Sequence, residues 1–178
     1  MKRTIAKYGL IAGLFLAVTF GMSVPLSGTP PDYGLMEVFG YASMILASLI
    51  IVLAQREYRS HNRDGSTGFG AFMKVGLGVA AIMGLVLGLY TFAHIAWLEP
   101  DFGQKYMAYS LDQMRTSGAT AAAVASQRAE MEAMMSAMNS PSLQGIIMFG
   151  TTFVMGAVVT AIGGFVMGRR RAIATPNM

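Results

Sequence analysis

The chain has 178 residues, of which 54% are hydrophobic and only 12% are charged. A water-soluble domain carries about 25% charged residues, because it must cover its surface with them. This composition therefore excludes an ordinary soluble domain and indicates a protein whose main solvent is lipid. The sequence has no cysteine, which excludes disulfides, thiol catalysis and zinc–thiolate sites.

Four apolar stretches are long enough to cross a membrane, which takes roughly 20 helical residues. In chain order they cover about residues 8–24, 35–54, 69–98 and 143–168. A hydroxyl cap followed by proline, at residues 140–141, is typical of a helix start and favours a last span that begins there. We therefore predict an all-α integral membrane protein. Its bundle of four transmembrane helices forms a single membrane domain over residues 1–178.

The first stretch also fits a cleaved signal peptide, because it is short and follows a basic leader that contains Lys2, Arg3 and Lys7. No convincing small-x-small cleavage site follows it, however. Its small residues are spaced as in packed membrane helices. We interpret it as a retained span.

The clusters of basic residues at the span ends all lie on one side of the membrane, whereas Lys105, Arg115 and Arg128 of the outer segment are offset by acidic residues. The clusters occur at residues 2–7, 56–63 and 169–171, whereas residues 25–34 contain no Lys or Arg. Lys and Arg near span ends stay in the cytoplasm, so both termini are expected to be cytoplasmic. The pI near 9.6 is therefore a topology signal, and we expect the lipid bilayer and no nucleic acid as a partner.

Small residues recur every four positions in three of the spans. Lipid supplies little hydrophobic force between helices, so close backbone approach through small residues matters. We predict that these residues pack helices tightly, within one chain or partly in a homo-oligomer. They are Gly9, Gly13, Ala17 and Gly21 in the first span, Gly76, Ala80, Gly84 and Gly88 in the third, and Gly156, Thr160, Gly164 and Gly168 in the fourth.

Residues 101–140 are too polar to enter the membrane and too regular for an unstructured loop. Asp101 and Gln104 suit a capping box for a helix over about residues 102–115. Gly118 separates this helix from a second one over about residues 121–138. We predict an extracytoplasmic amphipathic helical hairpin, between the third and fourth spans, that lies over the outer end of the bundle.

The second helix of this hairpin is rich in methionine. Thioethers bind soft ions such as Cu(I), but no cysteine supports such a site, and we expect no metal and no other cofactor. Methionine is also a flexible hydrophobe that suits adaptable contact surfaces. We interpret these methionines as a contact surface for a protein partner or as the core of the hairpin: Met131, Met134, Met135 and Met138.

Glu37 and His94 are ionisable residues inside spans, which makes them candidates for a functional role. Their spans run in opposite directions, so both side chains are expected about one turn below the outer surface, within reach of a mutual hydrogen bond. Tyr90 and Trp97 share a helical face with His94, at spacings of four and three residues. Together with Tyr33 they also mark the outer interface. The Glu37–His94 pair would sense pH, relay a proton or bind an anionic headgroup, or it would only fix the register of two helices.

No nucleophile, base and orienting group can be assembled in one place, so we expect a protein that is not an enzyme. The leading hypothesis is an accessory, scaffold or assembly partner that acts through the outer hairpin and the small-residue helix faces. The alternative is a small oligomeric transporter, or a proton-linked or lipid-binding membrane protein that uses Glu37 and His94. A polar cavity around these two residues would favour the alternative, whereas a filled core would favour the scaffold.

Five short segments, at residues 8–13, 39–44, 57–59, 68–76 and 99–102, carry a family resemblance over nearly the whole chain. Together with the polar helical insert before the last span, they resemble the bacterial membrane family catalogued as domain of unknown function 4199. The resemblance implies a four-span protein of the bacterial inner membrane. It implies no particular activity.

Overall fold

The computed structural model describes residues 1–26, 28, 31–62 and 68–172, with only the backbone given for residues 24, 25 and 169–172. Arg63, one of the basic residues used for the orientation, lies outside these residues. The side chains of Arg169, Arg170 and Arg171 also lie outside them. Within the described part the chain is almost entirely helical and contains no strand.

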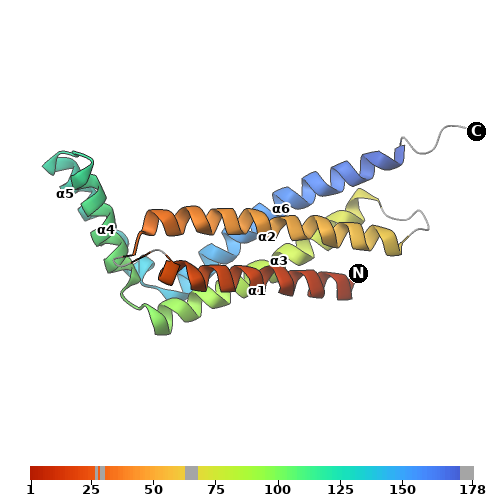
Figure 1. The fold of residues 1–178 in the computed structure, drawn as a ribbon, viewed down its shortest axis with the longest axis horizontal. Helices are drawn as coiled ribbons and strands as arrows, with labels where there is room; N and C mark the ends of the chain where they lie inside the picture. Colours follow the sequence, from red (N-terminus) through yellow and green to blue (C-terminus); the bar gives the residue numbers. More distant parts are fainter. Residues whose placement is uncertain (27, 29–30, 63–67, 173–178) are drawn as a thin grey trace, which may run out of the picture.

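Four long helices form the body of the molecule: α1 (Lys2–Leu26), α2 (Tyr33–His61), α3 (Phe69–Ala93) and α6 (Pro141–Ala172). Within the described residues these are the helices long and apolar enough to cross a membrane, which confirms the predicted four-span bundle. Two shorter helices, α4 (Phe102–Thr116) and α5 (Ala121–Met138), connect α3 to α6. The start of α1 and the end of α6 lie at one end of the bundle, and α4 and α5 project from the other (Figure 1).

Capping chemistry explains several helix starts. The Ser140 hydroxyl accepts a hydrogen bond from a first-turn backbone N–H at 3.4 Å, and α6 begins at Pro141, which confirms the predicted start. The capping box expected at Asp101 and Gln104 is wrong. Asp101 has a ψ of 14° instead of the extended backbone of an N-cap, and its side chain makes no capping bond. Its carboxylate lies 3.2 Å from the Lys105 ammonium instead.

The third span ends in a π-helical turn, η1 (His94–Leu98), in which the Glu99 amide donates to the His94 carbonyl at 2.8 Å. A π turn holds more residues than an α turn, so a spacing of three no longer returns to the same face. Trp97 therefore does not share the face of His94, which differs from the expectation. It is 77% exposed, and its ring packs edge-on against Phe92.

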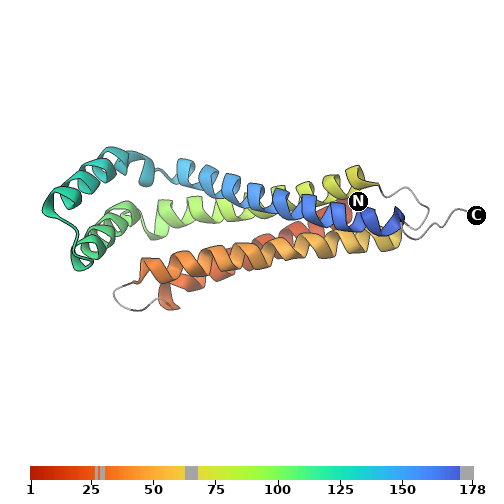
Figure 2. The ribbon, with the colours of Figure 1, turned by 90° about the horizontal axis from the view of Figure 1, so that it is seen from above.

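α3 is the central helix of the bundle. Half of its apolar stretch is buried, against 22–28% for the other three spans. Figure 2 shows α1 and α2 on one side and α3 and α6 on the other, with the two pairs spreading apart toward α4 and α5. The core between them consists of Ala12, Leu16, Met44, Ala47, Ile51, Ala54, Val75, Val79, Ala80, Met83 and Leu87.

Small residues allow α3 to approach α1 closely on one face. A Cβ added at Gly9 would lie 2.6 Å from Ile82 of α3, and one added at Gly13 would lie 2.6 Å from Val86. Both glycines are buried, and because glycine has no side chain, α3 packs directly against the backbone of α1 at these two positions. Ala17 is partly buried on the same helix.

The opposite part of α3 meets α6 by the same device. An added Cβ at Gly88 would lie 2.7 Å from the Gly145 carbonyl oxygen, and one at Gly156 would lie 2.6 Å from Ala80. Gly168 differs, because no atom lies within 4 Å of a Cβ added there. The remaining predicted packing residues meet these neighbours: Gly76 meets Thr160, Gly84 meets Phe149, Gly164 meets Phe69 and Phe72, and Gly21 meets Tyr90.

One polar side chain ties α2 to this α3–α6 pair. Gln55 is fully buried, and its Nε2 donates to the Phe72 carbonyl of α3 at 3.2 Å and to the Thr160 carbonyl of α6 at 3.1 Å. Its Oε1 lies against Gly163, where an added Cβ would collide with it. A buried amide with two hydrogen bonds fixes the rotation of α2 more narrowly than apolar contact does.

Gly163→Ala should therefore lower the melting temperature of the purified protein, with a loss of about 1–3 kcal/mol from overpacking against Gln55. The matched control is Gly150→Ala on the same helix, where no atom lies within 4 Å of an added Cβ. In a Gln55→Ala background the penalty of Gly163→Ala should largely disappear, because the colliding amide is gone. Thermal unfolding in detergent compares the four variants with the wild-type protein, and additive effects of Gln55→Ala and Gly163→Ala would contradict the contact.

Candidate functional site

A pocket of about 360 Å³ lies at the α4–α5 end of the bundle, where the two helix pairs spread apart. It is bounded by α1, α2, the end of α3 with its π turn, α4 and α6. Glu37, His94 and Tyr90 all line it, whereas Trp97 does not. The other lining residues are Phe20, Ser23, Tyr33, Met36, Gly40, Tyr41, Met44, Thr91, Ile95, Phe102, Tyr106, Gln144, Ile147, Met148 and Thr151.

Glu37 and His94 share this pocket but are not bonded to each other. His94 Nε2 lies 3.3 Å from a carboxylate oxygen of Glu99, five residues further along the chain. The His94 ring also stacks on Tyr90, with 5.7 Å between the ring centroids. The histidine is thus oriented by the π turn and by its own helix, and Glu37 is left to face the pocket.

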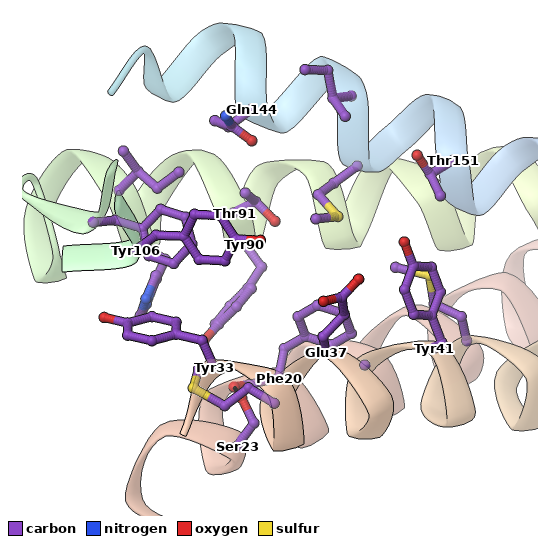
Figure 3. A pocket seen from close by; sticks show the side chains of 18 residues that line it. Phe20, Ser23, Tyr33, Glu37, Tyr41, Tyr90, Thr91, Tyr106, Gln144 and Thr151 are labelled. Carbon is purple, nitrogen blue, oxygen red and sulfur yellow. Dashed lines mark hydrogen bonds between the residues drawn. The ribbon is translucent and has the colours of Figure 1, made fainter. Parts of the chain in front are cut away.

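Glu37 lies one turn into α2, and its carboxylate points into the space between α2 and α6 (Figure 3). Tyr41 projects in the same direction from the next turn, and Gln144 and Thr151 lie on the opposite wall. No hydrogen bond or ion pair joins the Glu37 side chain to another residue in the described part of the chain. The lining residues that the structure describes include no Lys or Arg.

An aromatic cluster closes the outer end of the pocket. Tyr33 is only 7% exposed, and its ring meets Phe102 of α4 edge-on at 6.0 Å and Tyr106 at 5.8 Å. Tyr33 was expected to mark the lipid interface, but α4 covers it. The pair Phe102 and Tyr106, four residues apart on α4, is the sequence signal that could have indicated this contact.

Two hydrogen bonds hold α4 over the start of α2. The Tyr109 hydroxyl donates to Asp32 Oδ1 at 3.0 Å and accepts from the Gly34 amide at 3.2 Å. Asp32 Oδ1 also caps α2 by accepting from the Leu35 amide at 3.0 Å. The Leu35 amide first, and then the Tyr109 hydroxyl, hold the pKa of Asp32 below its usual range.

A charged cluster stands beside the π turn. Glu99, with a side chain only 16% exposed, lies between His94 and Lys105, whose ammonium is 3.2 Å away. Lys105 also reaches Asp101, and the hydrogen bond to Glu99, followed by that to Asp101, raises the pKa of Lys105. Glu99 and Lys105 are therefore paired with other residues of the protein. Glu37 is the carboxylate that lines the pocket.

The methionines of α5 contact α4 more than they face outward. Met131 is buried, and a Cβ added at Gly103 would lie about 3.1–3.2 Å from Met138 and from the Met135 sulfur. Of the four methionines in the predicted contact surface, Met134 is the exposed one, at 61%.

The lining of the pocket is mostly aromatic and apolar. The described residues contain no group of three His, Asp or Glu side chains placed to hold a metal ion. The pocket wall combines six aromatic rings with one carboxylate, one imidazole and a few neutral polar groups. Such a surface suits an organic ligand with an apolar body and one polar group.

The comparisons with known proteins identify the family. A family described as a protein of unknown function (DUF4199) matches residues 7–169, a range that includes the pocket residues. The chain belongs to this family. The DUF4199 match thus confirms the family that the five short segments indicated. No curated protein and no solved structure matches the chain.

The hydrogen bonds of Tyr109 predict a local change in a single-atom variant. Tyr109→Phe should accelerate amide hydrogen exchange at residues 33–36 in lipid nanodiscs, because α4 no longer holds the start of α2. Tyr106→Phe on the same helix is the matched control, since the hydroxyl of Tyr106 makes no hydrogen bond to a described residue. The hydrogen bond from Tyr109 to Asp32 needs the ionised carboxylate. The pKa of Asp32 is lowered in the folded protein, so this bond is fully present above the ordinary pKa of a carboxyl group and is lost only as the pH falls through the lowered pKa. The difference between the variants should therefore persist from neutral to mildly acidic pH, and equal exchange in both would contradict the role of Tyr109.

Proposed function

We propose that this DUF4199 protein binds a membrane-soluble organic cation, an amphiphile with an amine or quaternary ammonium group, in the pocket that contains Glu37. The observation that carries the proposal is a carboxylate that faces an aromatic, largely apolar pocket without a partner among the described residues. A polar cavity around Glu37 and His94 was the feature expected of transport or ligand binding, whereas a filled core was expected of a scaffold. The pocket contains both residues and is not filled, which supports ligand binding, although its lining is largely apolar instead of polar.

The chemistry of the lining favours a cation. The Glu37 side chain is exposed in the bundle and lines a largely apolar pocket, so a cation can reach its carboxylate, and the described lining supplies no Lys or Arg that would compete for it. Aromatic faces attract ammonium groups, by roughly 2 kcal/mol or more when water is excluded. Tyr41, Tyr90 and Phe20 surround the Glu37 carboxylate on the pocket walls (Figure 3).

We expect the ligand to reach the pocket from the lipid bilayer. Tyr41 of α2 and Ile147 of α6 line the pocket, yet they are 51% and 47% exposed on the side of the bundle that membrane lipids would cover. The pocket therefore opens sideways between α2 and α6. A ligand dissolved in the bilayer would enter there with its apolar part still in an apolar medium, which lowers the cost of binding.

The pocket supports binding in preference to catalysis, since no nucleophile paired with a base faces it among the described residues. An accessory role remains the second proposal, through the α4–α5 hairpin and its exposed Met134. Native mass spectrometry of the protein extracted gently from its own membrane separates the two. A retained organic amine would support ligand binding, and a defined complex with another protein would favour the accessory role.

Binding can be tested directly with dodecyltrimethylammonium and an uncharged dodecyl amide of the same chain length. In nanodiscs the protein should bind the cation more tightly, and Glu37→Gln should weaken cation binding by on the order of tenfold, about 1.4 kcal/mol, without affecting the amide. The matched control is Glu130→Gln, which removes an exposed carboxylate from α5. Equilibrium dialysis measures the affinities.

A second pair of variants separates the pocket from the surface. Thr151→Phe fills the pocket and should weaken binding of both probes, whereas Val154→Phe, on the exposed face of the same helix, should not. If neither probe binds the wild-type protein, or if Thr151→Phe leaves binding unchanged, the pocket is not the ligand site.

We also propose that the end carrying the start of α1 and the end of α6 is cytoplasmic, in the inner membrane of a bacterium. Lys2, Arg3 and Lys7 lie at this end with Arg56 and Arg59 of α2, the arrangement that the positive-inside rule associates with the cytoplasm.

The absence of native cysteine allows a clean test of this orientation. The test uses cells whose outer membrane has been removed and whose inner membrane is intact. A membrane-impermeant thiol reagent should label Ser126→Cys in α5 and should not label Ser60→Cys in α2. Both serines are exposed, so both variants should react after permeabilisation. Labelling of Ser60→Cys in intact cells would reverse the orientation.

A further inference from the structure

A second hollow lies between α2 and α6, at the end of the bundle opposite to α4 and α5. It is a groove of about 640 Å³, separate from the pocket around Glu37. Its walls are aliphatic, and three of the side chains that form them are also exposed on the outside of the bundle. These are Leu49 at 52%, Ile162 at 60% and Val166 at 48% exposure.

The groove is fixed by the packing beneath it. Gly163 lines its floor, and no side chain can occupy that position because the buried amide of Gln55 lies against it. The two hydrogen bonds of Gln55 hold α2 and α6 at this separation. The hollow is therefore a property of the folded bundle and not of a mobile side chain.

Two arginines stand at the polar end of the groove. Arg56 and Arg59 lie three residues apart on one face of α2, and Ser60 lies beside them. Arg59 Nη1 donates only to the Met167 carbonyl, at 3.4 Å, and neither guanidinium contacts a carboxylate in the described part of the chain. The neighbouring carboxylate, Glu57, is held by Lys7 at 2.6 Å and by Tyr8 at 2.8 Å.

We propose that this groove binds one anionic phospholipid. The phosphate lies at Arg56, Arg59 and Ser60, because guanidinium groups donate parallel hydrogen bonds to phosphate oxygens. One acyl chain runs along Leu49 and Ile162. The aliphatic walls face the membrane, so the phosphate comes from a lipid and not from free phosphate in solution.

The two arginine charges select the lipid. Basic pockets between membrane helices bind anionic headgroups, with about 1 kcal/mol from each Lys or Arg. Phosphatidylglycerol has a net negative charge, whereas phosphatidylethanolamine carries an ammonium group that the guanidinium groups repel. The groove should therefore prefer phosphatidylglycerol.

Native mass spectrometry of the full chain, released from nanodiscs with equal amounts of these two lipids, tests the proposal. The wild-type protein should retain one phosphatidylglycerol, and Arg56→Gln with Arg59→Gln should reduce its retention by on the order of tenfold. The matched control is Lys74→Gln, which removes an exposed positive charge from α3 that does not line the groove.

A groove-filling variant keeps the test independent of the arginines. Ile162→Trp preserves both charges and should still reduce retention, because the acyl chain loses its place. Val158→Trp, exposed one turn earlier on α6 and not part of the groove, is its control. Thermal unfolding establishes which variants are folded before they are compared.

Equal retention of the two lipids by the wild-type protein would overturn the proposal, as would unchanged retention in the arginine variant. Inorganic phosphate that binds the lipid-free protein in detergent as tightly as phosphatidylglycerol does would overturn the choice of a lipid. Glu37→Gln should leave phosphatidylglycerol retention unchanged, so this proposal and that for the other pocket succeed or fail separately.

Discussion

The close approach of α3 to both α1 and α6 is the constraint on which the rest of the structure depends. Helices in lipid gain little from burying apolar surface, so their association relies on contact between backbones that lack bulky side chains. Gly13 accommodates Val86 on one face of α3, and Gly88 meets Gly145 on another. Because α3 is committed to these two neighbours, α2 must cover the remaining side of the bundle. The pocket around Glu37 and the groove beside Arg59 are both lined by α2 and α6, so they follow from this arrangement.

Gln55 determines which face of α2 is turned toward α6. The Nε2 group of the buried Gln55 amide donates to carbonyls of both α3 and α6, whereas its buried Oε1 has no hydrogen-bond partner among the described residues. Residues that follow the helical period from it toward the two ends of α2 then face α6 as well. They include Glu37 and Tyr41 in the pocket at one end, and Arg59 in the groove at the other. Arg56 follows Gln55 directly in the chain, so it lies about 100° further around the helix and is exposed at the side of the groove. One hydrogen-bonded side chain thus positions charged groups at both ends of the helix.

The fold could be predicted from the sequence because its signals are local. The length of the apolar runs specifies four spans, and turn and capping residues place α5 at Ala121–Met138, as expected. The burial of Gln55 was not visible, because α2 continues to His61, about two turns beyond the polar residues expected to end it. Small-residue spacing predicted close packing but not which helix meets which, since that choice depends on contacts between distant segments.

The candidate site was predictable only in part, for the same reason. Glu37 and His94 were expected at the same depth because their spans run in opposite directions, and both residues do line one pocket. The partner of His94 could not be foreseen, because it depends on the π turn that brings Glu99 back to the imidazole. The same turn directs Trp97 away from the site. The aromatic cover over the pocket also needed tertiary information, since α4 had to fold back onto Tyr33.

The two hollows have opposite electrostatic character, and this argues for two binding sites instead of one path through the bundle. The pocket offers one carboxylate among aromatic rings, and the groove offers two guanidinium groups among aliphatic side chains. Between the pocket and the groove, the contact of α2 with α6 is filled by fully buried residues, including Ser48, Ile51 and Thr152. A ligand suited to one end would be repelled by charge at the other and blocked by packing in the middle. If both proposals hold, one copy of this chain binds an organic cation at one end and an anionic lipid at the other, and the charge of each site selects its ligand.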